Sequence, residues 1–113
     1  MARAILAGQM SSSRIDMLLG FIRQKPSDPF PRYALALEYK NAGRLEEART
    51  EFDTLLRDHG DYTAGYLHAG NLYLALGLKG EASAIYQRGI DVCIRRADTH
   101  ARGELEGALA GLA

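Results

Sequence analysis

The chain has 113 residues, enough for one domain with a modest core and too few for a second. Hydrophobic residues make up 47% and charged residues 25% of the sequence, a balance typical of a soluble globular domain. The formal net charge is zero, so the composition predicts no binding to nucleic acid or to an anionic membrane, which needs a concentrated basic patch.

The first ten residues, MARAILAGQM, contain one basic residue and a short apolar run from Ala4 to Ala7. This run is shorter than the roughly 7–15 apolar residues of a signal peptide or the roughly 20 of a membrane span. We therefore expect residues 1–10 to form an N-terminal tail, compatible with disorder, and expect no membrane insertion. The single cysteine, Cys93, excludes an intramolecular disulfide and favours a reducing, cytoplasmic location.

The first helix is predicted within residues 11–27, where serine hydroxyls can cap its start and Pro26 ends it. A second helix is predicted from Tyr33 to Asn41, and Gly43 can end it by adopting a left-handed conformation. A third follows in LEEARTEFDTLLRD, residues 45–58, where hydrophobic side chains share one face. These side chains are Leu45, Ala48, Phe52, Leu55 and Leu56.

The same order of residues recurs 34 positions later without a gap, from residues 32–52 to residues 66–86. The matched pairs are Leu35 with Ala69, Ala36 with Gly70, Tyr39 with Tyr73, Gly43 with Gly77, Ala48 with Ala82, and Phe52 with Tyr86. A shift of 34 in the other direction places Leu18, Phe21 and Ile22 on the second helix of a unit that has no first helix. The sequence thus predicts half a unit followed by two complete helical pairs, with small residues packed against aromatic ones.

Residues 98–112 break this pattern, because they contain three glycines and lack aromatic residues. Ala101, Leu105 and Ala108 lie at helical spacing, and Thr99 is the predicted N-cap. We expect a capping helix that covers the exposed face of the last unit. Ile94 stands where a helix-ending residue is expected, so the preceding helix is predicted to continue towards Ala97.

These units resemble the tetratricopeptide repeat (TPR), whose signature is W-x2-L-G-x2-Y, A-x3-F and a closing proline over 34 residues. RYALALEY with EEARTEF, and YLHAGNLY with GEASAIY, match it in register twice. The tryptophan position holds Arg32 or Tyr66, and the closing proline is present only as Pro26. The segment DPFPRYALALEY, residues 28–39, is also similar to the start of small bacterial single-domain TPR proteins.

The resemblance implies an all-α, right-handed α-solenoid of antiparallel helix pairs. It implies an N-terminal half repeat in residues 11–27, full repeats in residues 29–62 and 63–96, and a C-terminal capping helix in residues 98–112. It also implies a non-enzymatic adaptor or scaffold that binds a partner peptide or helix in the concave groove, which the first helix of each pair lines.

Helix phasing predicts which side chains line this groove, because the repeat signature residues face the interior. The predicted groove residues are Tyr33, Leu37, Lys40, Asn41, Leu67, His68, Asn71 and Leu74. Alternatively, the three leucines pack against the terminal helix. A clamp for a C-terminal carboxylate, as some family members have, is not predicted, because its lysine and asparagine positions hold Tyr33 and Leu37.

The sequence predicts no catalytic site, cofactor, metal site or small-molecule substrate. His59, His68 and His100 are far apart, and Cys93 has no second cysteine nearby. Cys93 is better explained as a buried thiol than as a nucleophile. The expected partner is another protein or peptide segment. The alternative function is a structural module that self-assembles into homo-oligomers through the exposed ends of its stack.

Overall fold

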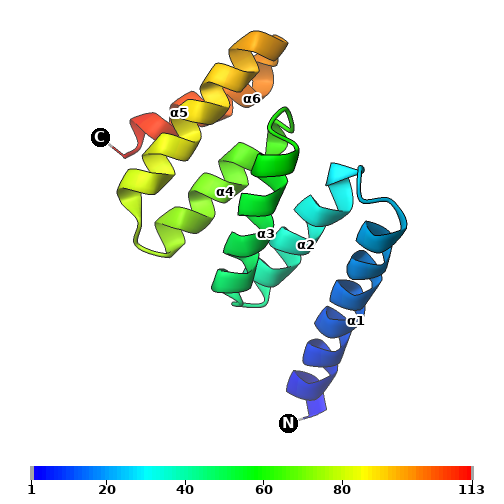
Figure 1. Ribbon diagram of the computed structural model, residues 1–113. Coiled ribbons are helices and arrows are strands. Elements are labelled where there is room, and N and C mark those ends of the chain that lie inside the picture. Colours follow the sequence, from blue (N-terminus) through cyan, green and yellow to red (C-terminus); the bar gives the residue numbers. More distant parts are fainter. Residues whose placement is uncertain (1, 113) are drawn as a thin grey trace.

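The computed structural model describes residues 2–112, and every regular element in this part of the chain is an α-helix (Figure 1). The elements are α1 (Ala2–Gln24), α2 (Pro29–Asn41), α3 (Leu45–Asp58), α4 (Ala64–Ala75), α5 (Lys79–Arg96) and α6 (Thr99–Ala110). The predicted all-α class is confirmed.

Two antiparallel hairpins, α2–α3 and α4–α5, form the centre of the molecule (Figure 1). They stack through contacts of α3 with α4 and of α2 with α4. α1 packs against α2 at one end, and α6 packs against α5 and α4 at the other. The first helices of the pairs, α2 and α4, therefore form one layer, and the second helices, α3 and α5, form the other. This is the predicted solenoid of helix pairs.

α1 is longer than the helix predicted within residues 11–27. It begins at Ala2, and so takes in residues that the sequence analysis assigned to an N-terminal tail. Gly8 is the only strong helix breaker among residues 2–12, which explains why helical backbone continues through the serines. At the other end, the amide of Lys25 donates to the carbonyl of Phe21 at 3.0 Å, and Pro26 follows the last turn.

The helices α2, α4 and α5 end in the same way. In each, an amide two or three residues beyond the helix donates to a carbonyl five residues earlier, at 2.9 Å. This closure requires a left-handed residue just before the donor. Gly43 and Gly77 supply it with φ angles of 77° and 79°, and Ala97 supplies it with 57°. The prediction that α5 continues past the usual turn is therefore confirmed, and the helix stops at Arg96 because Ala97 leaves the helical region.

Small residues lie against aromatic rings where the helices of a pair cross. Gly70 of α4 lies so close to Tyr86 of α5 that a Cβ on the glycine would be 2.2 Å from the ring carbon Cε1. At the equivalent positions of the first unit, Ala36 and Phe52 are both fully buried. This agrees with the predicted alternation of small and large side chains, which lets the helices approach closely.

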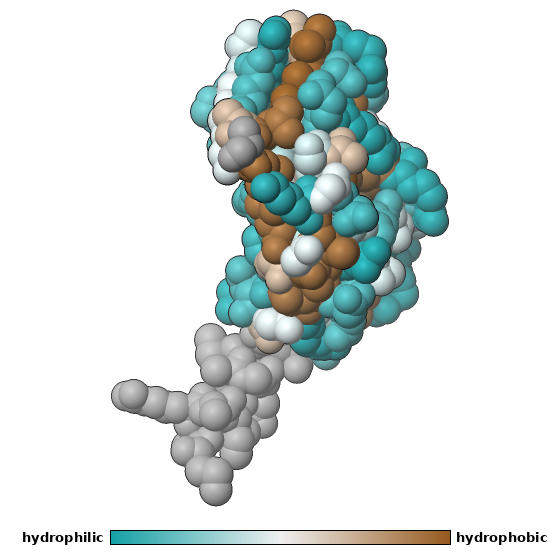
Figure 2. Space-filling view, turned by 90° about the vertical axis from the view of Figure 1, so that its left-hand side faces the viewer, coloured by the Kyte–Doolittle hydropathy of each residue, from teal (hydrophilic) through white to brown (hydrophobic). Residues whose placement is uncertain are grey.

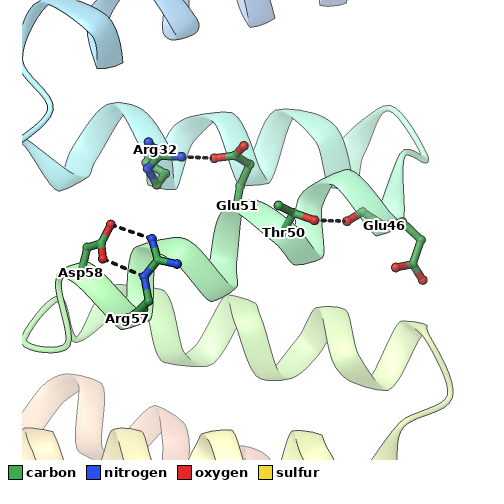
Figure 3. Close-up of polar contacts among 6 residues, drawn as sticks. All are labelled: Arg32, Glu46, Thr50, Glu51, Arg57 and Asp58. Atoms are coloured by element: carbon green, nitrogen blue, oxygen red, sulfur yellow. Dashed lines mark hydrogen bonds and ion pairs between the residues drawn. The ribbon is translucent and has the colours of Figure 1, made fainter.

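Polar contacts connect the helices outside this core. Arg32 of α2 and Glu51 of α3 form an ion pair at 2.5 Å across the first hairpin (Figure 3). Figure 3 also shows Arg57 paired with Asp58 at the end of α3, and the Thr50 hydroxyl donating to the Glu46 carbonyl within the helix. Only the first of these contacts links two helices, so it adds to the buried core that holds the hairpin together.

The start of α6 is fixed by Asp98. Its carboxylate accepts a hydrogen bond from the amide of Ala101 at 3.1 Å and another from the hydroxyl of Thr63 at 2.6 Å. The N-cap is therefore Asp98, and the prediction of Thr99 was wrong by one residue. A carboxylate accepts this bond more strongly than a hydroxyl, and its charge suits the helix dipole.

Candidate partner-binding surface

The predicted groove residues lie on α2 and α4, which are neighbours in one layer of the stack. α6 extends this layer beyond α4. Leu105 of α6 follows Ala69 by 36 residues, just as Ala69 follows Leu35 by 34, and all three side chains are fully buried. Within the described residues α6 contacts α4 and α5 and does not contact α2. α6 therefore takes the position that the first helix of a third pair would have, and it does not cover α2.

An aromatic cluster joins two of the predicted residues. The ring of Tyr33 lies 5.6 Å from the ring of His68 in an edge-to-face arrangement, and 5.3 Å from the ring of Tyr62. Phe30, with 59% of its surface exposed, lies 6.4 Å from Tyr33. Tyr33, Tyr62 and His68 are each partly buried and partly open to solvent. The cluster draws these rings from α2, from α4 and from the loop between α3 and α4.

The charges around this cluster have both signs. Burial lowers the pKa of His68; Lys40 lowers it further and Glu104 of α6 raises it. Burial likewise raises the pKa of Tyr33, with added contributions from Tyr62 and Glu104. The imidazole is therefore held neutral to lower pH than usual, so one ring nitrogen can donate and the other can accept a hydrogen bond. Sequence reasoning placed Lys40 here and missed Glu104.

The remaining predicted residues have different environments. Asn41 is exposed at the end of α2, whereas Leu37, Leu67 and Leu74 are partly buried and pack against the core. Asn71 accepts a hydrogen bond from the hydroxyl of Tyr86 at 2.5 Å, so its side-chain oxygen helps to hold α5 against α4. Its amide nitrogen keeps two donors for another group. The leucines thus combine core packing with partial exposure.

Phe30, Tyr62 and Glu104 were not predicted, for separate reasons. Tyr62 belongs to no predicted helix, and Glu104 lies on α6, where the offset from the previous unit is 36 rather than 34 residues. Phe30 precedes the predicted start of the helix at Tyr33, although α2 begins at Pro29. Placing the start of α2 by its N-cap, Asp28, whose side chain accepts from the Phe30 amide, is the signal that could have included Phe30.

Two other surfaces of the molecule differ from this one. A cleft of about 480 Å³ lies between α3, α4 and α5, with Tyr73 and Ile85 in its lining and charged side chains around it. Figure 2 shows a hydrophobic band along the molecule, on the side of the α4–α5 turn and the C-terminal end. Partly buried leucines near these turns, such as Leu76, Leu78 and Leu112, continue the core towards that side. The cleft contains one aromatic ring, that of Tyr73, whereas the cluster at Tyr33 brings three aromatic rings together.

The chemistry of the other candidate groups is limited. Cys93 is buried, and burial raises the pKa of its thiol, with Asp98 adding to the effect, so the thiolate is disfavoured. Among residues 2–112, no three His, Cys, Asp or Glu side chains converge to hold a metal ion. Within the same range, no helix is both long and apolar enough to cross a bilayer.

The stacked pairs, the shared helix-end geometry and the single layer of first helices define an α-solenoid built from helical hairpin repeats. The family model described as "Tetratricopeptide repeat" matches residues 63–93, which contain α4 and most of α5. The chain belongs to the tetratricopeptide repeat family. Domains of this family generally bind proteins or peptides and generally serve as non-catalytic scaffolds.

Two solved structures of tetratricopeptide repeat domain protein from Salinibacter ruber are similar to this chain. The solution NMR structure is 33% identical, has a TM-score of 0.74, and is matched over 78% of this chain and 89% of that one. The crystal structure is also 33% identical, with a TM-score of 0.71 and coverage of 75% and 94%. The search of curated proteins found no match.

Proposed function

We propose that the chain is an adaptor that binds a segment of another protein across the surface of α2, α4 and α6. The aromatic cluster of Tyr33, Tyr62 and His68 carries this proposal. Tyrosine rings offer large contact areas with few rotatable bonds, and they are enriched among residues that dominate binding energies. Here they stand partly exposed beside charges of both signs.

The surface favours a peptide segment with both apolar and polar groups. Leu37, Leu67 and Leu74 provide apolar contact, while the amide nitrogen of Asn71 and the neutral ring of His68 can hydrogen-bond to a partner's backbone. A carboxylate clamp is not part of this proposal, since the lysine and asparagine positions of such a clamp hold Tyr33 and Leu37. The buried free thiol of Cys93 is compatible with the cytoplasmic location that we expect for the adaptor.

The test is selection of binding peptides from a displayed random library, followed by calorimetry of a selected peptide. Tyr33→Ala should weaken its binding about tenfold or more, because the ring contributes to a desolvated contact. Ile94→Ser, at a 52% exposed position on α5, should leave the affinity unchanged. Circular dichroism checks that each variant keeps its helices. Unchanged affinity in a folded Tyr33→Ala variant contradicts the proposal.

The alternative function, self-assembly through the ends of the stack, is favoured by one observation. Met17 and Phe21 of α1 are exposed by 53% and 44%, respectively. They lie at the N-terminal end of the stack, on a helix outside the proposed peptide-binding surface.

A further inference from the structure

α1 occupies the place of the second helix of a unit, and no first helix of that unit lies among residues 2–112. In the complete units α3 packs on α2 and α5 packs on α4, whereas among the described residues α1 packs only on α2, the first helix of the following unit. The 34-residue shift aligns Phe21 with Leu55, which is fully buried in its unit. Phe21 and Met17 are exposed, and no helix within the described part of the chain covers them as α2 and α4 cover the later second helices.

The shape of this face suits another helix. Met17, Gly20 and Phe21 lie on one side of α1, because residues three and four apart are neighbours on a helix surface. A Cβ at Gly20 would meet nothing closer than a side-chain atom of Arg23, at 4.0 Å. A glycine between two large side chains lets the backbone of a facing helix approach closely.

The charges along this face are complementary to a reversed copy of themselves. Asp16 and Arg23 are both exposed, seven residues apart, and neither forms an ion pair with another described residue. If two copies of α1 pack antiparallel, Asp16 of each copy lies beside Arg23 of the other. In the same register Met17 of each copy lies close to Phe21 of the other, and the two Gly20 residues lie next to the two-fold axis. A parallel arrangement would place like charges together.

The other end of the stack presents a polar face. In α6 the position equivalent to Ala36 and Gly70 is Glu106, 36 residues after Gly70. Glu106 pairs with Arg102 at 3.5 Å, and both side chains are about half exposed. A helix packed here would remove charges from water without covering exposed apolar surface. This argues against head-to-tail stacking of α1 on α6 and leaves a symmetric contact.

We propose that the chain forms a homodimer in which the α1 helices of two copies pack antiparallel through Met17, Gly20 and Phe21. The occupant of this face is a second copy, because one two-fold axis pairs the charges of both copies and brings their exposed Met17 and Phe21 side chains together. With two large hydrophobic side chains per copy, the interface is at the small end of specific interfaces, and the dissociation constant is expected to be about 10 µM or weaker. The proposal is independent of the peptide-binding surface on α2, α4 and α6.

Sedimentation velocity of the full chain from about 10 µM to about 1 mM provides the first measurement. We expect a shift from monomer to dimer and no larger species. Phe21→Ser should raise the dissociation constant about tenfold, because the loss of apolar contact occurs in both copies. Ile94→Ser, which changes another exposed hydrophobic residue, on α5, should leave the dissociation constant unchanged. A monomer at every concentration, or growth beyond the dimer, overturns the proposal.

A charge exchange tests the antiparallel geometry. Asp16→Arg alone and Arg23→Asp alone should each weaken dimerisation about tenfold, because each replaces two attractive contacts by repulsive ones. The double variant Asp16→Arg/Arg23→Asp should recover most of the lost affinity. Both residues are exposed, so the fold should tolerate each change, and circular dichroism verifies this. A double variant no tighter than the single variants overturns the antiparallel arrangement.

Discussion

Gly70 determines how closely α4 and α5 approach. A methyl group at this residue would meet three carbons of the Tyr86 ring at 2.2–2.8 Å, and the ring is only 1% exposed. The ring is also held at its far end, where its hydroxyl donates to Asn71. Neither side of the contact can therefore move without disturbing other packing.

We predict that Gly70→Ala lowers the free energy of unfolding by about 1–3 kcal/mol, the usual cost of overpacking a core. Gly103→Ala is the matched control, since a Cβ at Gly103 in α6 meets nothing within 4 Å. It should raise the free energy of unfolding by about 0.5–1 kcal/mol, because alanine favours helix over glycine. Urea unfolding followed by circular dichroism measures both. Equal effects of the two substitutions would contradict the packing argument.

The residues of the proposed binding surface show what a repeat pattern can and cannot predict. Tyr33 and His68 were predicted because they lie on the side of each helix that the inward-facing signature residues do not occupy. Their contact with Tyr62 depends on how the loop between α3 and α4 folds back, which no periodicity encodes. The bond from Tyr86 to Asn71 was missed because it depends on how far a hydroxyl reaches between helices.

At the scale of elements, the ends of helices explain the differences from prediction. Glycine marks the ends of α2 and α4 in the sequence, and their positions follow from it. The end of α5 carries no such mark, because Ala97 adopts the left-handed conformation despite its Cβ. The order and pairing of the helices followed from the 34-residue repeat, whereas α6 required a shift of 36 residues that only the structure supplies.

Two opposite substitutions test this account of the helix ends. Ala97→Gly should raise the free energy of unfolding by about 0.5–1 kcal/mol. Glycine adopts the left-handed conformation without the steric strain of alanine, and this gain exceeds the cost of its greater conformational entropy in the unfolded chain. Gly43→Ala should lower it by about 1–2 kcal/mol, because a Cβ there meets no atom within 4 Å and only the φ angle of 77° opposes it. Thermal unfolding measures both. A loss of stability in Ala97→Gly would refute the proposed strain.

At the scale of the whole molecule, the tyrosines connect the packing to pH. Burial raises the pKa of every tyrosine above its usual value near 10. They are spread over α2, α4, α5 and the α3–α4 loop: Tyr33, Tyr39, Tyr62, Tyr66, Tyr73 and Tyr86. Ionising them therefore opposes the stacking of both hairpins at once.

We predict that the fold is lost cooperatively at alkaline pH. A raised folded-state pKa gives stability that is fully present below pH 10 and is lost as the pH rises through the folded value. Helical circular dichroism should therefore fall at the pH where tyrosinate absorbance rises, and the two curves should coincide. Tyr39→Phe keeps a buried ring without the ionisable hydroxyl, so it should move the unfolding midpoint to higher pH. Tyrosinate absorbance that rises near pH 10 while the helices persist would show that burial does not raise these pKa values.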